Sequence, residues 1–296
     1  MSDSKFELTS ETKIVGVRTL HRIRALRDIP RWGVKSGDLG GWLESERNLA
    51  QSGGAWVSGD AWVYGGAQVS GDAWVSGDAW VSGGARVSGD AQVSGDAWVS
   101  GGALVSGGAQ VAGGARVSGG ARVSGDAQVS GNARVSGNAR VYGGAQVSGG
   151  AQVSGDAQVS GNAWVSGGAR VSGGARVSGD AQVYGDALVY GDAQVSGNAW
   201  VSGDAQVSEP SHVLTVGPVG SEGCTATLHR TITGHALHVG CWRNGTVDAL
   251  PAEVERRAAD WTGSDADMQR WRAEYQALIP LFRLRAASFH TEGETA

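Results

Sequence analysis

The sequence predicts an all-β solenoid with a different kind of segment at each end, and three observations lead to this class. From Gly53 to Ser208 the 296-residue chain consists of 26 copies of one six-residue pattern, Gly-(Asp/Gly/Asn)-Ala-x-Val-(Ser/Tyr/Ala), without insertion or deletion. The glycine, alanine and valine of every copy are kept, whereas x varies among Trp, Gln, Arg and Leu. Glycine accounts for 50 residues and proline for only five, which excludes collagen, while 41% hydrophobic content argues against disorder.

The repeat itself, residues 53–208, predicts strands separated by tight corners. In an extended Ala-x-Val segment the side chains alternate between two faces, so Ala and Val point one way and x the other. An interior of constant width accepts invariant Ala and Val but not Trp, Arg and Gln in turn, so we expect x to face solvent. The Gly-Asp, Gly-Asn and Gly-Gly pairs supply the corners, because glycine adopts positive φ freely and Asn and Asp tolerate it.

This pattern resembles the hexapeptide repeat of the left-handed parallel β-helix family, in which an aliphatic residue is followed four positions later by a small one. The resemblance implies a single-stranded parallel β-helix with three hexads in each triangular coil, so that 26 hexads make between eight and nine coils. The left-handed sense and the three-hexad coil are implied by the resemblance alone.

Residues 1–52 predict an N-terminal β cap. Residues 13–29 alternate apolar and polar side chains as one or two strands do, and residues 33–49 predict a turn followed by a short ordered segment. A solenoid end exposes unpaired backbone and open core, so terminal units of different sequence are expected. With Gly40-Gly41-Trp42 ahead of the repeats, the segment resembles the entry region of uncharacterised hexapeptide-repeat proteins of bacteria and phages, some carrying an acetyltransferase label.

Residues 209–296 predict a small α+β capping domain. Residues 212–217, 225–232 and 235–242 have the composition of three strands separated by glycine-bearing turns. Two helices follow: Pro251 suits a first helical turn, and Ser264 with Asp267 forms a capping box. The second helix has apolar residues at three- and four-residue steps, namely Met268, Trp271, Tyr275, Leu278, Ile279 and Phe282. This tail also resembles that of the phage-type proteins.

The charge and composition of the chain indicate where the protein is located in the cell and which classes of partner are disfavoured. No stretch is apolar enough to cross a membrane and the first residues do not form a signal peptide, so we expect a cytoplasmic protein without membrane partners, in the host cytoplasm if phage-encoded. The net charge is −5 and none of the three regions is strongly basic, which disfavours nucleic acid as a partner. Cys224 and Cys241 are too few for a disulfide scaffold and are expected to be free thiols.

An acyltransferase that uses a CoA thioester is the enzymatic alternative, because the resembling family includes such enzymes with a histidine as general base. No hexad is interrupted by a loop that would build a groove, and all six histidines lie outside the repeat. They are His21, His212, His229, His235, His238 and His290. An acyltransferase site would have to form at the junction with the last coils and use His229, His235 or His238, but we expect these three to be exposed residues of a capping sheet.

Neither a metal nor another cofactor is expected. The ligand types of zinc occur in Cys224, His229, His235, His238 and Cys241, but their spacing fits no zinc module. Aspartates such as Asp60, Asp78 and Asp96 recur at the corners, where Gly or Asn also occurs, so we interpret them as turn residues and not as calcium ligands.

The x positions supply the candidate interaction face. Sorted in steps of 18, one row contains only Trp and Gln, a second begins with three consecutive tryptophans, and a third mixes Arg, Gln and Leu. Contiguous exposed aromatics without charge indicate a contact surface; stacking that only stabilises the sheets is the alternative. The candidate residues are Trp56, Trp62, Trp74, Trp80, Trp98, Trp164 and Trp200.

The function that follows is a non-enzymatic structural module, a rigid scaffold or assembly element that docks another protein or a second copy of itself. Catalytic residues are not assigned. Aromatic rings near arginines are also typical of surfaces that hold sugar rings or single-stranded nucleic acid, so a carbohydrate-binding solenoid remains an alternative beside the acyltransferase.

Overall fold

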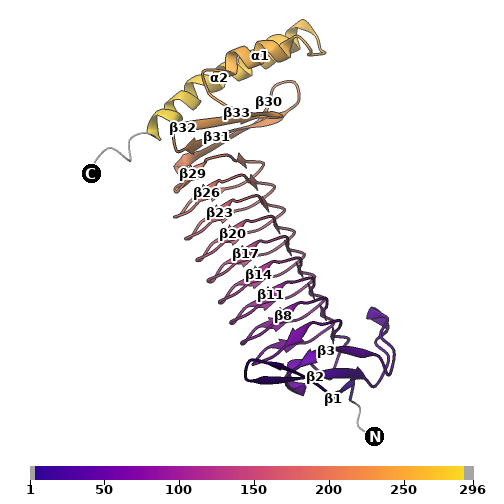
Figure 1. Ribbon diagram of the computed structural model, residues 1–296. Helices are drawn as coiled ribbons and strands as arrows, with labels where there is room; N and C mark the ends of the chain where they lie inside the picture. Colours follow the sequence, from indigo (N-terminus) through magenta and orange to yellow (C-terminus); the bar gives the residue numbers. More distant parts are fainter. Residues whose placement is uncertain (1–3, 290–296) are drawn as a thin grey trace, which may run out of the picture. The chain divides into compact units, whose positions relative to one another are not determined.

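The computed structural model describes residues 4–289 and divides the chain into two compact units, Met1–Asn162 and Ala163–Ala296. Each unit contains part of the repeat, folded as a parallel β-solenoid (Figure 1). The expected regions 1–52, 53–208 and 209–296 were drawn from composition, whereas the division between compact units falls inside the repeat. The two units are described in turn.

The solenoid strands of the first unit are two residues long and occur once per hexad. β4 (Trp56–Val57) pairs in parallel with β7 (Trp74–Val75), so that Val57 lies beside Val75. One coil therefore takes three hexads, as the hexapeptide resemblance implied, and the unit contains three sheets with one strand per coil.

The strands of this unit form three sheets, and the x residues of one sheet lie in a row on its outer face. The first sheet contains β4, β7, β10 (Gln92–Val93), β13 (Gln110–Val111), β16 (Gln128–Val129) and β19 (Gln146–Val147). The second contains β5 (Trp62–Val63), β8 (Trp80–Val81), β11 (Trp98–Val99), β14 (Arg116–Val117), β17 (Arg134–Val135) and β20 (Gln152–Val153). The third contains β6 (Gln68–Val69), β9 (Arg86–Val87), β12 (Leu104–Val105), β15 (Arg122–Val123), β18 (Arg140–Val141) and β21 (Gln158–Val159). The three rows expected from steps of 18 are thus confirmed within this unit.

The interior of the coils has the predicted composition. Every alanine and valine of the pattern is at most 1% exposed. Coils are joined by backbone hydrogen bonds in which the x residue donates to the alanine carbonyl of the next coil, as from Trp74 N to Ala91 O at 2.9 Å. The first glycine of each hexad has φ between 60° and 72° and forms the corner. Burial of these alanines and valines thus stabilises a repeat whose glycine, alanine, aspartate and asparagine residues are otherwise depleted in strands.

The N-terminal segment forms a cap of three longer strands. β1 (Phe6–Val15) and β2 (Arg18–Ala25) make an antiparallel hairpin, followed by the 3-10 turn η1 (Pro30–Trp32). β3 (Leu39–Leu43) pairs antiparallel with β2 and parallel with β5, which makes it the first rung of the second sheet. A further 3-10 turn, η2 (Glu46–Asn48), leads into the coils.

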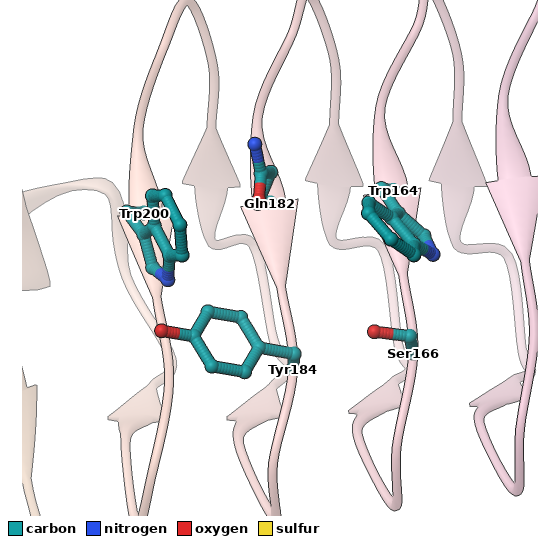
Figure 2. A pocket seen from close by; sticks show the side chains of 5 residues that line it. All are labelled: Trp164, Ser166, Gln182, Tyr184 and Trp200. Atoms are coloured by element: carbon teal, nitrogen blue, oxygen red, sulfur yellow. The ribbon is translucent and has the colours of Figure 1, made fainter. Parts of the chain in front are cut away.

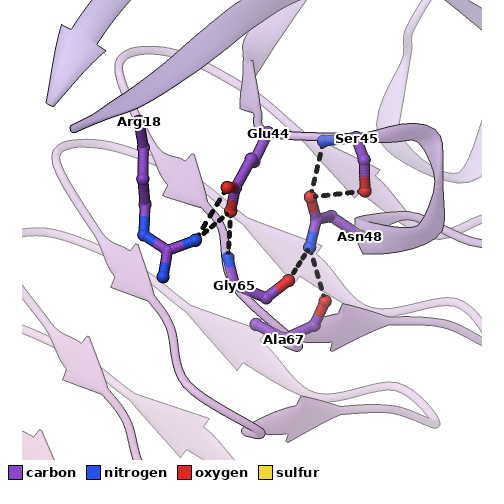
Figure 3. Close-up of polar contacts among 6 residues, drawn as sticks. All are labelled: Arg18, Glu44, Ser45, Asn48, Gly65 and Ala67. Carbon is purple, nitrogen blue, oxygen red and sulfur yellow. Dashed lines mark hydrogen bonds and ion pairs between the residues drawn. The ribbon is translucent and has the colours of Figure 1, made fainter.

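Polar side chains of the cap satisfy the backbone groups that the first coil leaves unpaired (Figure 3). The Glu44 carboxylate accepts a hydrogen bond from Gly65 N at 2.6 Å and is paired with Arg18. The Asn48 amide donates to the carbonyls of Gly65 and Ala67 at 3.1 and 2.9 Å. This solenoid end therefore offers no open strand edge at these positions, as a cap requires.

The second unit begins with eight further two-residue strands. These are β22 (Trp164–Val165), β23 (Arg170–Val171), β24 (Arg176–Val177), β25 (Gln182–Val183), β26 (Leu188–Val189), β27 (Gln194–Val195), β28 (Trp200–Val201) and β29 (Gln206–Val207). Each pairs with the strand three places along the chain, as in Trp164 with Gln182 and Gln182 with Trp200.

An antiparallel sheet of four strands, in chain order, follows the last coil. The short turn η3 (Pro210–His212) leads to β30 (Val213–Val219), β31 (Cys224–Thr231), β32 (Gly234–Val239) and β33 (Trp242–Gly245). Three of these strands were predicted and β33 was not. The helices α1 (Leu250–Ala258) and α2 (Asp265–Ser288) complete the unit, and Ser264 caps α2 through the predicted capping box with Asp267.

Both faces of this sheet are covered. On one side Leu228, Leu237 and Phe282 join a core between the sheet and the helices, which lie across it in Figure 1. On the other side β31 lies against the last coil, where Ala205 forms a bridge with Thr231 and Thr227 Oγ1 accepts from Trp200 N at 3.2 Å. The sheet thus closes the solenoid end, in agreement with the expected cap.

No helix among residues 4–289 is both long and apolar enough to span a membrane.

Candidate functional site

Three of the predicted tryptophans form a continuous row in the first unit, which we call the tryptophan ridge: Trp62, Trp80 and Trp98. The rings of Trp62 and Trp80 stack at 4.8 Å with an interplanar angle of 9°, and Trp98 meets Trp80 edge-on at 5.7 Å. Exposure increases along the ridge, from partial burial at Trp62 and Trp80 to 37% at Trp98. Its accessible part is therefore the end formed by Trp80 and Trp98.

The cap covers the other end of the ridge. Lys13 Nζ lies 4.9 Å from the ring centre of Trp62 and 4.8 Å from that of Trp42, the residue paired with Trp62. Cations over ring faces are stabilising, most of all when desolvated. Trp62 thus serves the junction of cap and coils, which favours the structural alternative for this one residue.

Beyond Trp98 the same sheet turns basic. The Arg116 guanidinium lies 5.7 Å from the ring centre of Trp98, and Arg134 follows on the next strand. A hollow of about 410 Å³ lies over this region. It is lined by Asp78, Trp80, Asp96, Trp98, Gly114, Arg116 and Asn132.

Two predicted face residues are engaged by the cap instead. Trp56 is 1% exposed, so the expectation that every x residue faces solvent is wrong at the first rung. A Cβ on Gly40 would lie 2.7 Å from the Trp56 ring, which explains the glycine at position 40. Trp74 is half-buried and packs against Trp32 at 4.9 Å.

The remaining two tryptophans, Trp164 and Trp200, flank a separate slot in the second unit (Figure 2). They stand on either side of Gln182, because β22 and β28 both pair with β25. The slot has a volume of about 250 Å³ and is completed by Ser166 and Tyr184. Trp164 is 47% exposed.

Arg243 of β33 supports one wall of this slot. Its guanidinium lies 3.1 Å from the ring centre of Trp200, and its charge interacts with the Tyr184 hydroxyl. Tyr184 in turn meets Trp200 edge-on at 5.4 Å. Burial lowers the pKa of Arg243 from its usual value, and a guanidinium group is not deprotonated in proteins, so Arg243 is a cation.

Sequence reasoning missed Ser166, Tyr184 and Arg243. The first two occupy the last position of their hexads, and sorting that position in steps of 18 would have placed Ser166, Tyr184 and Ser202 in one row. No comparable signal exists for Arg243, because β33 lies outside the repeat.

Two histidines of the capping sheet, His229 and His238, are buried, and the expectation that they are exposed is wrong, whereas His235 is half-buried. His229 is 0% and His238 1% exposed, because the sheet is covered on both faces. Their Nε2 atoms lie 2.9 Å apart, and Ser202 Oγ lies 3.3 Å from Nε2 of His238. His235 accepts a hydrogen bond from Val247 N and lies apart from this pair.

The backbone fixes the protonation of the pair. Asn244 N–H can only donate, so His238 accepts at Nδ1 and carries its hydrogen on Nε2. The Arg230 carbonyl can only accept, so His229 donates from Nδ1 and accepts at Nε2. His238 therefore donates to His229, and its Nε2 cannot take a proton from Ser202. Burial lowers the pKa of His229 to about 4 and that of His238 to about 3, and both rings are neutral at pH 7.

The other candidate ligands are dispersed. Cys224 Sγ lies 3.6 Å from the Tyr275 hydroxyl and Cys241 is exposed beside Arg257; both are free thiols. Within residues 4–289 no three His, Cys, Asp or Glu side chains are grouped as a metal site would require. His212 accepts from Ser208 N next to the last coil, and His290 lies outside the described residues.

The fold and its aromatic faces define a β-solenoid repeat protein. The family model described as the YdcK beta solenoid repeat matches this chain, which is therefore similar to that family along the coils. The matched segments are 67–83, 85–101, 91–107, 127–137, 133–149, 151–167, 157–173, 181–193 and 193–209. A search of curated proteins finds no match.

Proposed function

We propose that the protein is a non-enzymatic scaffold whose tryptophan ridge docks a second copy of the same chain. The observation that carries this proposal is the accessible end of the ridge, where Trp80 and the 37%-exposed Trp98 border a hollow of about 410 Å³ beside Arg116. Large aromatics and arginine are the residues most enriched where binding energy concentrates in protein interfaces.

The order of residues along this sheet favours a twofold-related copy as the occupant. Aromatic residues come first and Arg116 and Arg134 follow, while Asp78 and Asp96 flank the aromatic half. In a dimer with a twofold axis the same patch is used by both chains in opposite directions. The aromatic and acidic half of one copy would then face the basic half of the other, which combines cation–π contacts with charge pairs.

The closed ends of the coils support lateral contact over end-to-end growth. The first coil gives its free backbone groups to Glu44 and Asn48, and β31 lies across the last coil in the second unit. Strand addition at either end would have to displace these caps, whereas contact through the ridge displaces nothing but water.

The acyltransferase alternative has less support. A general base has to reach its substrate and accept a proton, whereas His229 and His238 are buried and hydrogen-bonded to each other. Micromolar binding of acetyl-CoA, measured by calorimetry, would contradict the non-enzymatic proposal.

The double variant Trp80→Gln/Trp98→Gln tests the ridge. Gln already occupies position 152 of this sheet, so the coils should fold with an unchanged far-UV circular dichroism spectrum. We expect the dissociation constant of the dimer, measured by analytical ultracentrifugation, to rise at least about a thousandfold, since both chains carry the substitutions and four aromatic hot spots on the order of 1–2 kcal/mol each are lost.

Trp164→Gln is the matched control, because it removes an even more exposed tryptophan from the other unit and should leave the dimer unchanged. A double variant that associates like the wild type would refute the proposal. If the double variant unfolds, the ridge is a structural ladder and the proposal also fails.

A further inference from the structure

A second feature of the coils, the slot between Trp164 and Trp200, is independent of the tryptophan ridge. We propose that this slot binds one ring of a neutral oligosaccharide or polysaccharide, seated over Gln182 between the two indoles (Figure 2).

The spacing of the two walls suits a single ring. The strands that carry Trp164 and Trp200 lie on either side of β25, each one strand spacing of about 4.8 Å away, so a ring seated over Gln182 lies about one such spacing from the strand of either tryptophan. This distance falls in the range of about 4.5–7 Å at which rings pack favourably against aromatic side chains. The slot of about 250 Å³ is smaller than the pockets of about 300–1,000 Å³ that enclose drug-sized ligands, and it is open to solvent at Trp164.

The chemistry of the lining favours a sugar over other ring compounds. A pyranose presents C–H groups on its faces, which are attracted to the electron-rich faces of indole rings. Its hydroxyl groups project around the rim and need both donors and acceptors, which the Gln182 amide and the Ser166 hydroxyl supply.

The absence of charge from the lining separates a neutral sugar from a nucleotide. All five side chains that line the slot are neutral, whereas phosphate groups are held mainly by Lys and Arg. Arg243 lies against Trp200 and does not belong to the lining. Nucleic acids and anionic glycans are thus the less favoured occupants.

The wall at Trp200 is also fixed before a ligand arrives. Arg243 packs on its ring, Tyr184 packs against its edge, and Thr227 accepts a hydrogen bond from its backbone N–H. Side chains already held in place lose little conformational entropy on binding, which raises affinity for a given contact area.

Saturation-transfer NMR and calorimetry on the full chain test the proposal, with cellohexaose, maltohexaose and chitin hexasaccharide as neutral probes. We expect at least one of them to bind. Trp164→Gln, which keeps a residue that the same row contains at position 182, should weaken that binding about tenfold, and Gln182→Leu should weaken it by loss of the amide.

Trp98→Gln is the control, because it removes an exposed tryptophan that has no opposite wall and should leave sugar binding unchanged. Circular dichroism verifies that each variant is folded. Three results would overturn the proposal: no binding of any probe, equal binding by Trp164→Gln, or displacement of the sugar by heparin or an oligothymidylate that itself binds more tightly. Because the ridge is tested by association and the slot by sugar binding, either proposal can fail alone.

Discussion

The first glycine of each hexad satisfies two constraints at once. Gly101 has φ of +66°, which L side chains rarely adopt, and a Cβ there would lie 3.0 Å from Gly119 N in the next coil. The next residue, Gly102, has neither constraint: its Cβ would lie 3.6 Å from Gly119 O and its φ is not positive. This difference explains why the first position is always glycine while the second accepts Asp, Asn or Gly.

Gly101→Ala and Gly102→Ala therefore form a matched pair at a single corner. We expect Gly101→Ala to lower the free energy of unfolding by about 2 kcal/mol or more, because left-handed backbone alone costs roughly 1–2 kcal/mol and the contact with Gly119 adds to it. Gly102→Ala should change it by less than about 0.5 kcal/mol. Urea unfolding curves of the two variants give the comparison, and equal losses would show that corner geometry does not explain the invariant glycine.

Sequence periodicity predicted the side-chain directions within the coils, because each hexad meets the same neighbours. It could not predict the burial of Trp56, because the strand β3 of the cap lies against this residue. The same limit applies to His229 and His238, since period-two alternation in β31 identifies two faces but not what covers each. Arg243 was not predicted because β33 lies outside the repeat.

At the scale of elements, the sheet β30–β33 acts as a plate between the last coil and the helices. Alternate residues of β31 serve the two sides, with Leu228 in the helical core and Thr227 and His229 toward the coil. A polar side chain enclosed in this way must find hydrogen-bond partners, which the two histidines find in each other and in the backbone. The plate therefore depends on both rings being neutral.

The stability of this plate should depend on pH. Histidine in an unfolded chain titrates near 6.5, whereas burial holds the pKa of His229 at about 4 and that of His238 at about 3. Between these values the unfolded chain binds protons that the folded chain does not, so the free energy of unfolding falls as the pH falls. The contribution is complete above about pH 6.5 and declines below it by up to about 1.4 kcal/mol per pH unit for each histidine.

Urea unfolding at pH 7.5 and pH 5, followed for wild type and for His229→Gln/His238→Gln, measures this effect. The double variant should lose less stability on acidification than the wild type, whatever its stability at pH 7.5. Carboxylates also take up protons on acidification, but they are present in both proteins and their effect on stability cancels in the comparison. One of them is Glu253, whose pKa is lowered to about 2 by its hydrogen bond with Arg256. Equal losses would mean that the histidine pair does not control the plate.

For the whole molecule, the repeat predicts the fold class but does not predict what the outer surfaces bind. Buried Ala and Val are the same in every coil, so they specify a solenoid without indicating what it contacts. The ridge and the slot each arise where x residues fall in register along a single sheet, with Tyr184 added at the slot, and this register depends on 18-residue steps. Strand positions and rows were predictable for this reason, whereas the burial of Trp56, the burial of the two histidines and the strand β33 depended on contacts outside the repeat.

The central claim is that the coils present a surface for a second copy of the chain. Light scattering coupled to size-exclusion chromatography tests it most directly, with the wild-type protein at several concentrations. We expect a mass that rises with concentration toward twice the 30.2 kDa of one chain, because a twofold interface closes at two copies. A constant mass of 30.2 kDa at every concentration would contradict the claim, as would a trimer or a growing filament.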